Sequence, residues 1–125
     1  MANEMTWSPA EKAIARKAFD LALHREFEAV IQEVRNRAEG IKEPSDLWEL
    51  ERYLTSSRKM IDDRYDYRYS RLPMIFATLI VEGRLSLEDL HGLREDKLDY
   101  IRRVLSIADD WAARHNESES EVPSA

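Results

Sequence analysis

Residues 8–40 read SPAEKAIARKAFDLALHREFEAVIQEVRNRAEG and contain neither glycine nor proline between Pro9 and Gly40. Ser8 is a residue type that caps helices, Pro9 suits the first turn, and Glu11 stands at the capping-box position. The stretch therefore predicts one helix from Pro9 to Glu39, about 45 Å long at 1.5 Å per residue. Apolar residues recur at helical spacing along one stripe, which comprises Phe19, Leu23, Phe27, Val30, Val34 and Ile41.

Further helices are predicted downstream of this stretch, and no lasting period-two alternation predicts a strand. Residues 40–44 (GIKEP) form a turn, and a second helix is expected from Ser45 to about Arg68. A short apolar helix follows Pro73 and stops at Gly83, and a capping-box pattern opens another at residues 86–92. A last helix is expected over residues 94–114.

These elements predict an all-α fold built on a long antiparallel helical hairpin. We expect residues 8–69 to form this hairpin as a stalk and residues 70–114 to form a small C-terminal helical head. Together they make one domain, residues 1–115, and the acidic tail of residues 116–125 is expected to be disordered.

The first helix has more apolar surface than one neighbouring helix covers, because Ile14, Leu21 and Ile31 lie off the main stripe. A compact chain of 125 residues has a radius of gyration of about 14 Å, so a helix of about 45 Å protrudes from it. A homodimer with two-fold symmetry is the simplest way to cover the second apolar side.

The composition excludes several classes of site. The formal net charge of −6 argues against bulk affinity for nucleic acid or anionic lipid, and the absence of cysteine excludes disulfides and thiolate metal sites. The longest apolar run, from Pro73 to Val81, is about half of a membrane span, and the N-terminus lacks a signal-peptide pattern. We therefore expect a cytoplasmic protein with no cofactor, no metal, no nucleic-acid partner and no membrane contact.

Few residues have the arrangement that catalysis requires. Glu88-x-x-His91 is half of the motif that di-iron bundles use, and such a site needs a second copy and further carboxylates. The carboxylate pairs Asp62–Asp63 and Glu26–Glu28 point to different sides of a helix. We do not expect an enzyme, and a carboxylate-bridged metalloenzyme is kept as an alternative that the metal content would decide.

Residues 64–71 read RYDYRYSR and allow two interpretations. Interleaved arginine and tyrosine can clamp and stack single-stranded nucleic acid. Alternatively, the tyrosines pack at the foot of the hairpin and the arginines between them are solvated.

Trp48 also allows two interpretations. It lies about 160° around the second helix from Leu50, on a side rich in charged residues. A large indole ringed by polar groups is typical of an interface hot spot. Alternatively, the indole is buried against a neighbouring helix of the same chain.

Residues 46–68 fit the pattern DLWxLxxYLxxxRxxIDxxYDxR. Matching residues continue upstream at Trp7-Ser8 and FxxAxxRE (residues 19–26), and downstream at EGRxSLxDL (residues 82–90). Over roughly residues 7 to 105 the chain resembles the fluorescence recovery protein family of cyanobacteria.

The resemblance implies an all-α homodimer with an extended helical hairpin and a small helical head, and it implies a regulatory activity rather than bond chemistry. Members bind the photoactivated red form of the orange carotenoid protein, mainly through its C-terminal domain. They speed its return to the resting form, which ends phycobilisome fluorescence quenching.

The resemblance also assigns site residues. Trp48 and Arg58 match partner-binding residues, Glu51-Arg52 replaces a His-Asp pair, and Met74 and Tyr100 stand where the family has a phenylalanine and a lysine. Leu47 matches a leucine at the dimer contact. We assign the remaining expected interface residues to the same surface: Phe27, Val34, Trp48 and Leu54.

The replacement of the His-Asp pair inverts the charge at Arg52, in the middle of the expected partner surface. It indicates a divergent branch of the family, and it leaves a second interpretation open. In that interpretation the fold and the dimer are kept, and the native partner is a different protein.

Overall fold

The computed structural model describes the backbone of residues 5–120 and the side chains up to residue 116. Every regular element in this part of the chain is helical, so the all-α prediction is confirmed there. The elements are α1 (Pro9–Glu39), α2 (Pro44–Arg64), α3 (Leu72–Val81), the 3-10 turn η1 (Leu87–Leu90) and α4 (Glu95–Ser120).

The predicted bounds of the first helix are confirmed, because α1 runs from Pro9 to Glu39. The Ser8 side chain accepts a hydrogen bond from the Glu11 N–H at 3.1 Å, and Glu11 Oε1 accepts one from the Ser8 N–H at 3.0 Å. This capping box fixes where the helix begins. At the other end, the Gly40 N–H donates back to Arg37 O, and the chain turns.

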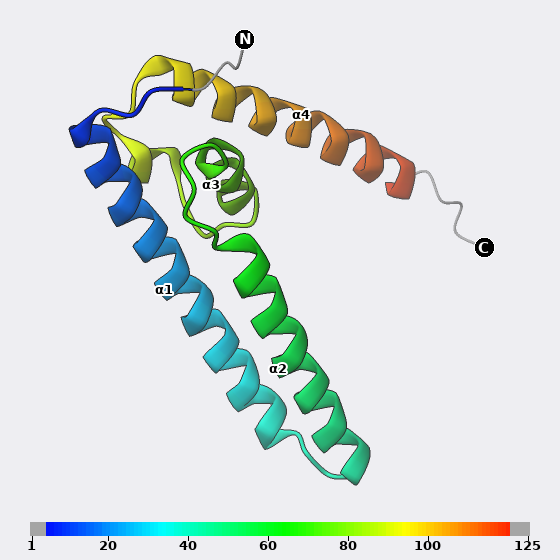
Figure 1. Ribbon diagram of the computed structural model, residues 1–125. Helices are drawn as coiled ribbons and strands as arrows, with labels where there is room; N and C mark the ends of the chain where they lie inside the picture. Colours follow the sequence, from blue (N-terminus) through cyan, green and yellow to red (C-terminus); the bar gives the residue numbers. More distant parts are fainter. Residues whose placement is uncertain (1–4, 121–125) are drawn as a thin grey trace.

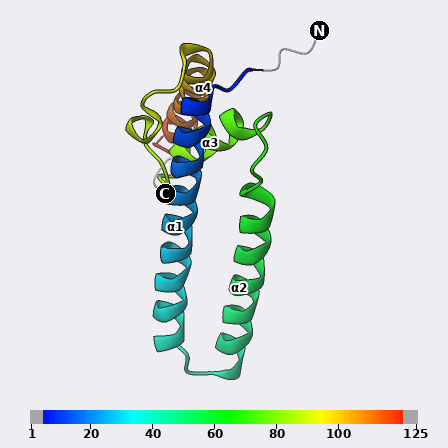
Figure 2. The ribbon, with the colours of Figure 1, turned by 60° about the vertical axis from the view of Figure 1, so that its left-hand side comes forward.

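α2 returns alongside α1 in the opposite direction (Figures 1 and 2). Ser57 and Ile61 are the buried residues of α2, and the Arg37 guanidinium lies 4.4 Å from the centre of the Tyr53 ring. Near the turn, Asp46 accepts hydrogen bonds from the Lys42 and Glu43 N–H groups at 2.9 and 3.0 Å. The two helices are therefore joined by a short turn that is itself hydrogen-bonded.

The prediction that the second helix continues to about Arg68 is wrong, since α2 ends at Arg64. The next residues, 65–68, are non-helical, and the Arg68 N–H donates to Asp66 O at 2.9 Å in a tight turn at Tyr67. Tyr65 and Tyr67 both meet the Phe19 ring edge-on, with ring centres 5.5 and 5.0 Å apart. Tyr69 continues the row at 5.4 Å from Tyr67. Leaving the helix therefore brings all three tyrosine rings to one aromatic cluster.

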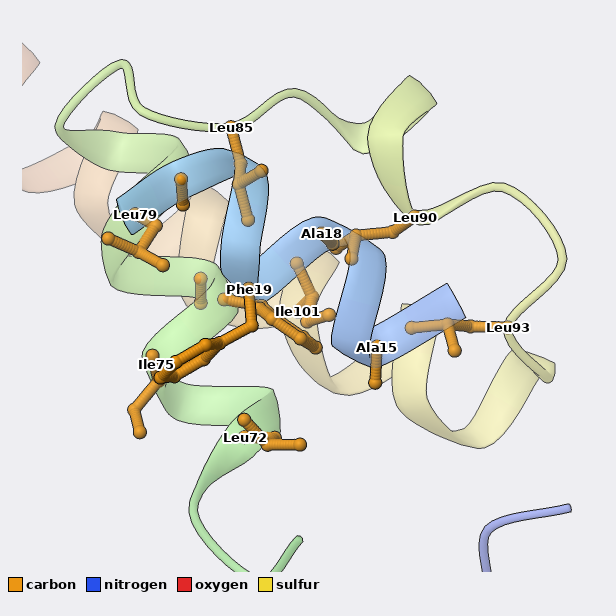
Figure 3. Close-up of a cluster of buried hydrophobic side chains, with 13 residues drawn as sticks. Ala15, Ala18, Phe19, Leu72, Ile75, Leu79, Leu85, Leu90, Leu93 and Ile101 are labelled. Atoms are coloured by element: carbon orange, nitrogen blue, oxygen red, sulfur yellow. The ribbon is translucent and has the colours of Figure 1, made fainter. Parts of the chain in front are cut away.

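The hydrophobic core lies where α1 meets α3, η1 and the start of α4 (Figure 3). α3 is apolar on every side, and Leu72, Phe76 and Leu79 on it are fully buried. Small residues on α1 let the other elements approach closely, because Ala15, Ala18 and Ala22 are buried there. The core therefore occupies one end of the molecule, and the far half of α1 and α2 extends away from it (Figure 1).

Two further expectations require correction. The helix expected at residues 86–92 is a single 3-10 turn, η1, capped by Ser86 and Asp89 as its sequence predicts. The last helix, expected to end at residue 114, continues to Ser120 and so enters the segment expected to be a disordered tail. No glycine or proline stands between Gly92 and Pro123, and extending an existing helix costs little free energy. Residues 121–125 of the expected tail lie outside the described residues.

Candidate functional site

An apolar surface is exposed along the far half of α1 and α2. We call it the α1–α2 face and define it by Phe27, Ile31, Val34, Leu47 and Leu54. Four of these side chains are among the most exposed large apolar groups of the chain, and Val34 is half-buried. Isolated exposed apolar residues are ordinary, whereas a contiguous group of them marks an interaction surface.

Helix geometry places these residues on one side of the pair. Arg37 and Tyr53 face each other across it. Phe27 and Val34 lie roughly 60–80° around α1 from Arg37, and Leu54 lies about 100° around α2 from Tyr53. Both angles are counted in the direction of increasing residue number about the axis of the helix concerned. Because the two helices are antiparallel, equal rotations counted in this way lead to the same side of the pair.

Trp48 lies about 100° around α2 from Leu47, outside this face, and its side chain is 58% exposed. Burial of its indole against a helix of the same chain is therefore excluded. Glu51, Arg52 and Arg58 are exposed on the same helix, and none of them enters an ion pair within the described residues. An exposed tryptophan beside unpaired charges is the arrangement that protein–protein hot spots use.

Arg52 lies beside a shallow hollow of about 320 Å³ between the helices, which is also lined by Arg37, Glu49, Tyr53 and Ser56. Arg37 already covers the Tyr53 ring in this region, and Arg52 does not cover the Trp48 ring in the described structure. The Arg52 charge thus stands at the surface and is open to a partner.

Met74 and Tyr100 lie apart from Trp48, in the other half of the molecule. Met74 is on α3, where it is exposed, and Tyr100 is on α4, half-buried against the core. The structure thus places the expected partner-binding residues in two groups, one on α2 and one on α3 and α4, and no contact in the described residues joins them.

The α1–α2 pair is held to the core by a buried polar network that the sequence analysis did not find. The Glu26 side chain is 5% exposed, accepts a hydrogen bond from the Tyr65 hydroxyl at 3.0 Å, and lies 3.2 Å from Arg84 Nε. Burial and the hydrogen bond to Glu26 raise the pKa of Tyr65. The tyrosine therefore stays protonated and keeps donating.

Arg25, the residue before Glu26 on α1, extends this network. Its Nη1 donates to Arg84 O at 2.8 Å and to Asp89 Oδ2 at 3.0 Å. Burial opposes ionisation of Asp89, but hydrogen bonds from Ser86 and Arg25 outweigh it and lower the pKa of this carboxyl. The motif residues Arg25, Glu26, Arg84 and Asp89 thus act together to fix α1 against the 84–89 loop.

A second buried pair holds the beginning of α1. Lys97 on α4 is fully buried, and its Nζ lies 2.8 Å from Glu11 Oε2. It also donates to Thr6 O at 2.6 Å and lies 4.8 Å from the centre of the Trp7 ring. Burial raises the pKa of Glu11, yet hydrogen bonds from Lys97 and from the Arg94 and Ser8 N–H groups outweigh it and lower the pKa to about 2.

The described structure gives little support to a metal site or to a nucleic-acid-binding surface, the two alternatives that the sequence left open. Within residues 5–116, no group of three or more His, Asp or Glu side chains is placed to hold a metal ion. Tyr65, Tyr67 and Tyr69 are partly buried in the aromatic cluster, and Arg68 and Arg71 pair with Asp66 instead of forming an open basic surface. The part of the chain that the structure describes also holds no helix with the length and apolarity of a membrane crossing.

The fold and the exposed surfaces together define an all-helical protein whose candidate site is an open face for another protein. The sequence model of a family described as photoprotection regulator fluorescence recovery protein matches residues 7–106. The chain therefore belongs to the fluorescence recovery protein family.

Individual relatives agree with this assignment. The fluorescence recovery protein of Synechocystis sp. PCC 6803 is 36% identical over 101 residues, which cover 81% of this chain and 93% of the relative. A solved structure of the Fremyella diplosiphon protein is 46% identical and has a TM-score of 0.76, with 81% of this chain and 98% of that chain covered. A solved structure of the Synechocystis protein is 35% identical and has a TM-score of 0.75, with 79% and 97% covered.

Proposed function

We propose that this chain is a non-enzymatic regulator that binds the photoactivated orange carotenoid protein, mainly its C-terminal domain, and accelerates its relaxation to the resting form. Phycobilisome fluorescence quenching then ends. Membership of a family of photoprotection regulators supports the proposal. The single structural observation that carries it is the exposed Trp48 among the unpaired charges of Glu51, Arg52 and Arg58. We further propose that the protein acts in the cytoplasm.

This activity has a simple physical form. Binding speeds relaxation only if the regulator stabilises the transition state, or the reassociation of separated domains, more than it stabilises the red state. A rigid helical scaffold that holds two domains raises their effective concentration. The two groups of expected contact residues suit such a scaffold, with Trp48 and its neighbours on α2 and with Met74 and Tyr100 on α3 and α4.

The active species in this proposal is a homodimer formed through the α1–α2 face. Phe27, Val34, Leu47 and Leu54 form the seam, and Trp48 contributes to the interface from the neighbouring side of α2. Their exposure in the single chain supports this, because burying apolar surface contributes roughly 25 cal/mol per Å². In this arrangement residues 8–69 form the stalk, residues 70–114 form the head, and the two belong to one domain.

A second candidate keeps the fold and the dimer and assigns a different protein partner. One observation favours it: Arg52, where the resemblance implies an aspartate, is exposed and unpaired within the described residues. A charge inverted at the centre of an interface costs a cognate partner several kcal/mol, on the order of a like-charge contact.

The decisive experiment follows the dark recovery of a purified orange carotenoid protein after photoconversion to its red form. Recovery is measured by absorbance with and without this chain at substoichiometric dose. Faster recovery supports the proposal, and unchanged recovery with a folded protein present overturns it in favour of another partner. Arg52→Asp is the informative variant, because faster recovery with this variant alone would show that Arg52 is what redirects binding.

A further inference from the structure

The C-terminal half of α4 carries an apolar seam that nothing in the described structure covers. Tyr100, Val104, Ile107 and Trp111 follow one another at spacings of four, three and four residues, which is the spacing of a coiled-coil seam. Tyr100 and Val104 are half-buried against the core, whereas Ile107 is 69% and Trp111 is 61% exposed. The Trp111 ring is further ordered by stacking on His115, with ring centres 3.6 Å apart.

The seam is exposed because α4 is much longer than the helix that it packs on. α3 has 10 residues and α4 has 26, so α4 exceeds α3 by about 24 Å at 1.5 Å per residue. Figure 1 shows this half of α4 projecting past α3, away from α1 and α2. The family match ends at residue 106, so Ile107 and Trp111 lie beyond it.

Charge along α4 identifies the occupant. Arg102 and Arg103 precede Ile107, and Asp109 and Asp110 follow it. Arg103, Asp109 and Asp110 are exposed and enter no ion pair within the described residues. A second α4 laid antiparallel about the middle of the seam sets its aspartates against these arginines, whereas a parallel one sets like charges together.

We infer that the C-terminal half of α4 is a second self-association surface, which pairs antiparallel with α4 of another copy of this chain. In this pairing Val104 meets Ile107 of the other copy, Tyr100 meets Trp111, and Arg103 flanks Asp110 on both sides of the two-fold axis. The seam is short, so its area falls below that of standard interfaces, and the contact forms at high protein concentration.

This surface is separate from the α1–α2 face and does not rest on the proposed function. Two different two-fold contacts on one chain join dimers into tetramers or longer assemblies. The α4 contact therefore links whatever species the α1–α2 face forms.

The first test is sedimentation velocity of the full chain from micromolar to several hundred micromolar protein. The mass is expected to rise about twofold across this range, and Ile107→Asp should abolish that rise. Ser106→Asp is the matched control, because it places the same charge one residue away, at an exposed position about 100° around α4 from Ile107 and outside the seam. A rise that Ile107→Asp leaves intact, or no rise at all in the parent chain, overturns the inference.

The second test examines orientation. Arg103→Glu or Asp110→Arg alone should abolish the rise in mass, and the double variant should restore it, because the exchange rebuilds the antiparallel ion pairs. The chain has no cysteine, so any cross-link arises only from the introduced thiols. A mixture of Arg103→Cys and Asp110→Cys chains should cross-link with a short bis-maleimide several-fold more than either variant by itself. Equal cross-linking in all three samples, or no restoration in the double variant, overturns antiparallel pairing.

Discussion

Lys97 Nζ lies 2.8 Å from Glu11 Oε2, and this buried contact joins the first turn of α1 to the first turn of α4. Both side chains are almost inaccessible to water, so each ion depends on the other and on hydrogen bonds with the backbone: Lys97 donates to Thr6 O, and Glu11 accepts from the Ser8 and Arg94 N–H groups. Removal of one partner from a buried ion pair leaves an uncompensated charge, which lowers the free energy of unfolding by about 3–5 kcal/mol. The pair is therefore a sensitive point of the fold.

The first prediction concerns acid. The folded-state pKa of Glu11 is about 2, below its ordinary value of 4.5, so the group contributes stability above pH 4.5 and loses it as the pH falls to about 2. Each pKa unit corresponds to about 1.4 kcal/mol, so the total loss is about 3 kcal/mol. Urea unfolding at a series of pH values measures it.

The control for this prediction is Glu11→Gln. Asp89 also has a lowered pKa and adds to the acid slope, so the difference between the parent chain and Glu11→Gln isolates Glu11. The variant should be less stable at pH 7 and should lose less on acidification. Parallel pH profiles for the two proteins would contradict the assignment.

A second prediction concerns the Tyr65 hydroxyl, which donates to Glu26 Oε1 at 3.0 Å and lies 3.2 Å from Ala22 O. Tyr65→Phe keeps the ring on Phe19 and leaves the Glu26 carboxylate short of a donor. The expected cost is about 1–3 kcal/mol in the free energy of unfolding, as for a buried acceptor that loses its partner. Tyr53→Phe is the matched control, and an equal effect of the two substitutions would show that the network contributes nothing.

The third prediction compares two glycines. Gly92 has a φ of 104°, and a Cβ there would lie 2.5 Å from Ile14 Cδ1, whereas Gly40 has a φ of −89° and room for a Cβ. Gly92→Ala should lower stability by more than about 1 kcal/mol, and Gly40→Ala should be neutral or stabilising by up to about 1 kcal/mol. Thermal melts of both variants decide it, and equal melting temperatures would refute the strain at Gly92.

The fourth prediction tests the α1–α2 face. Leu47→Glu places a charge in the proposed seam, so the variant should be a monomer at micromolar concentration by light scattering. Ser56→Glu adds the same charge on the opposite side of α2 and should leave the dimer intact. A dimer that survives Leu47→Glu would mean that the interface lies elsewhere.

The fifth prediction separates binding from folding at Trp48. Since the side chain is 58% exposed, Trp48→Ala should change the melting temperature little and should weaken carotenoid-protein binding at least tenfold, as hot-spot truncations do. Leu87→Ala removes an exposed apolar side chain that belongs neither to the expected contact residues nor to the α4 seam, and it should leave binding unchanged. A large melting loss that accompanies the binding loss would instead indicate a structural role.

Local signals predicted the helices well, because their determinants are close in sequence. The Ser8–Glu11 capping box and Gly40 bound α1 correctly, and Ser86–Asp89 located η1. The sequence does not reveal that α2 ends at Arg64 and not at Arg68, although the tyrosines in RYDYRY alternate with a period of two residues. The meaning of this alternation depends on Phe19, which lies far away in the sequence.

The candidate site was only partly predictable for the same reason. Spacing left Trp48 undecided between a buried and an exposed position, because the neighbours of a helix are set by tertiary packing. Ile31 was placed off the main stripe, yet it lies four residues after Phe27 and shares the exposed face. The Glu11–Lys97 pair and the exposure of Ile107 depend on how α4 crosses the core, for which the sequence carries no short-range signal.

α1 continues without a break from the core, where Ala15 and Phe19 are buried, to the turn beside α2. A single rigid helix therefore fixes the distance between the two ends of the molecule. Over about 45 Å, a tilt of 1° at the core displaces the far end by only about 0.8 Å, so the spacing hardly varies. In a bound molecule that contacts both ends, the length of α1 sets the distance between the two contacting parts.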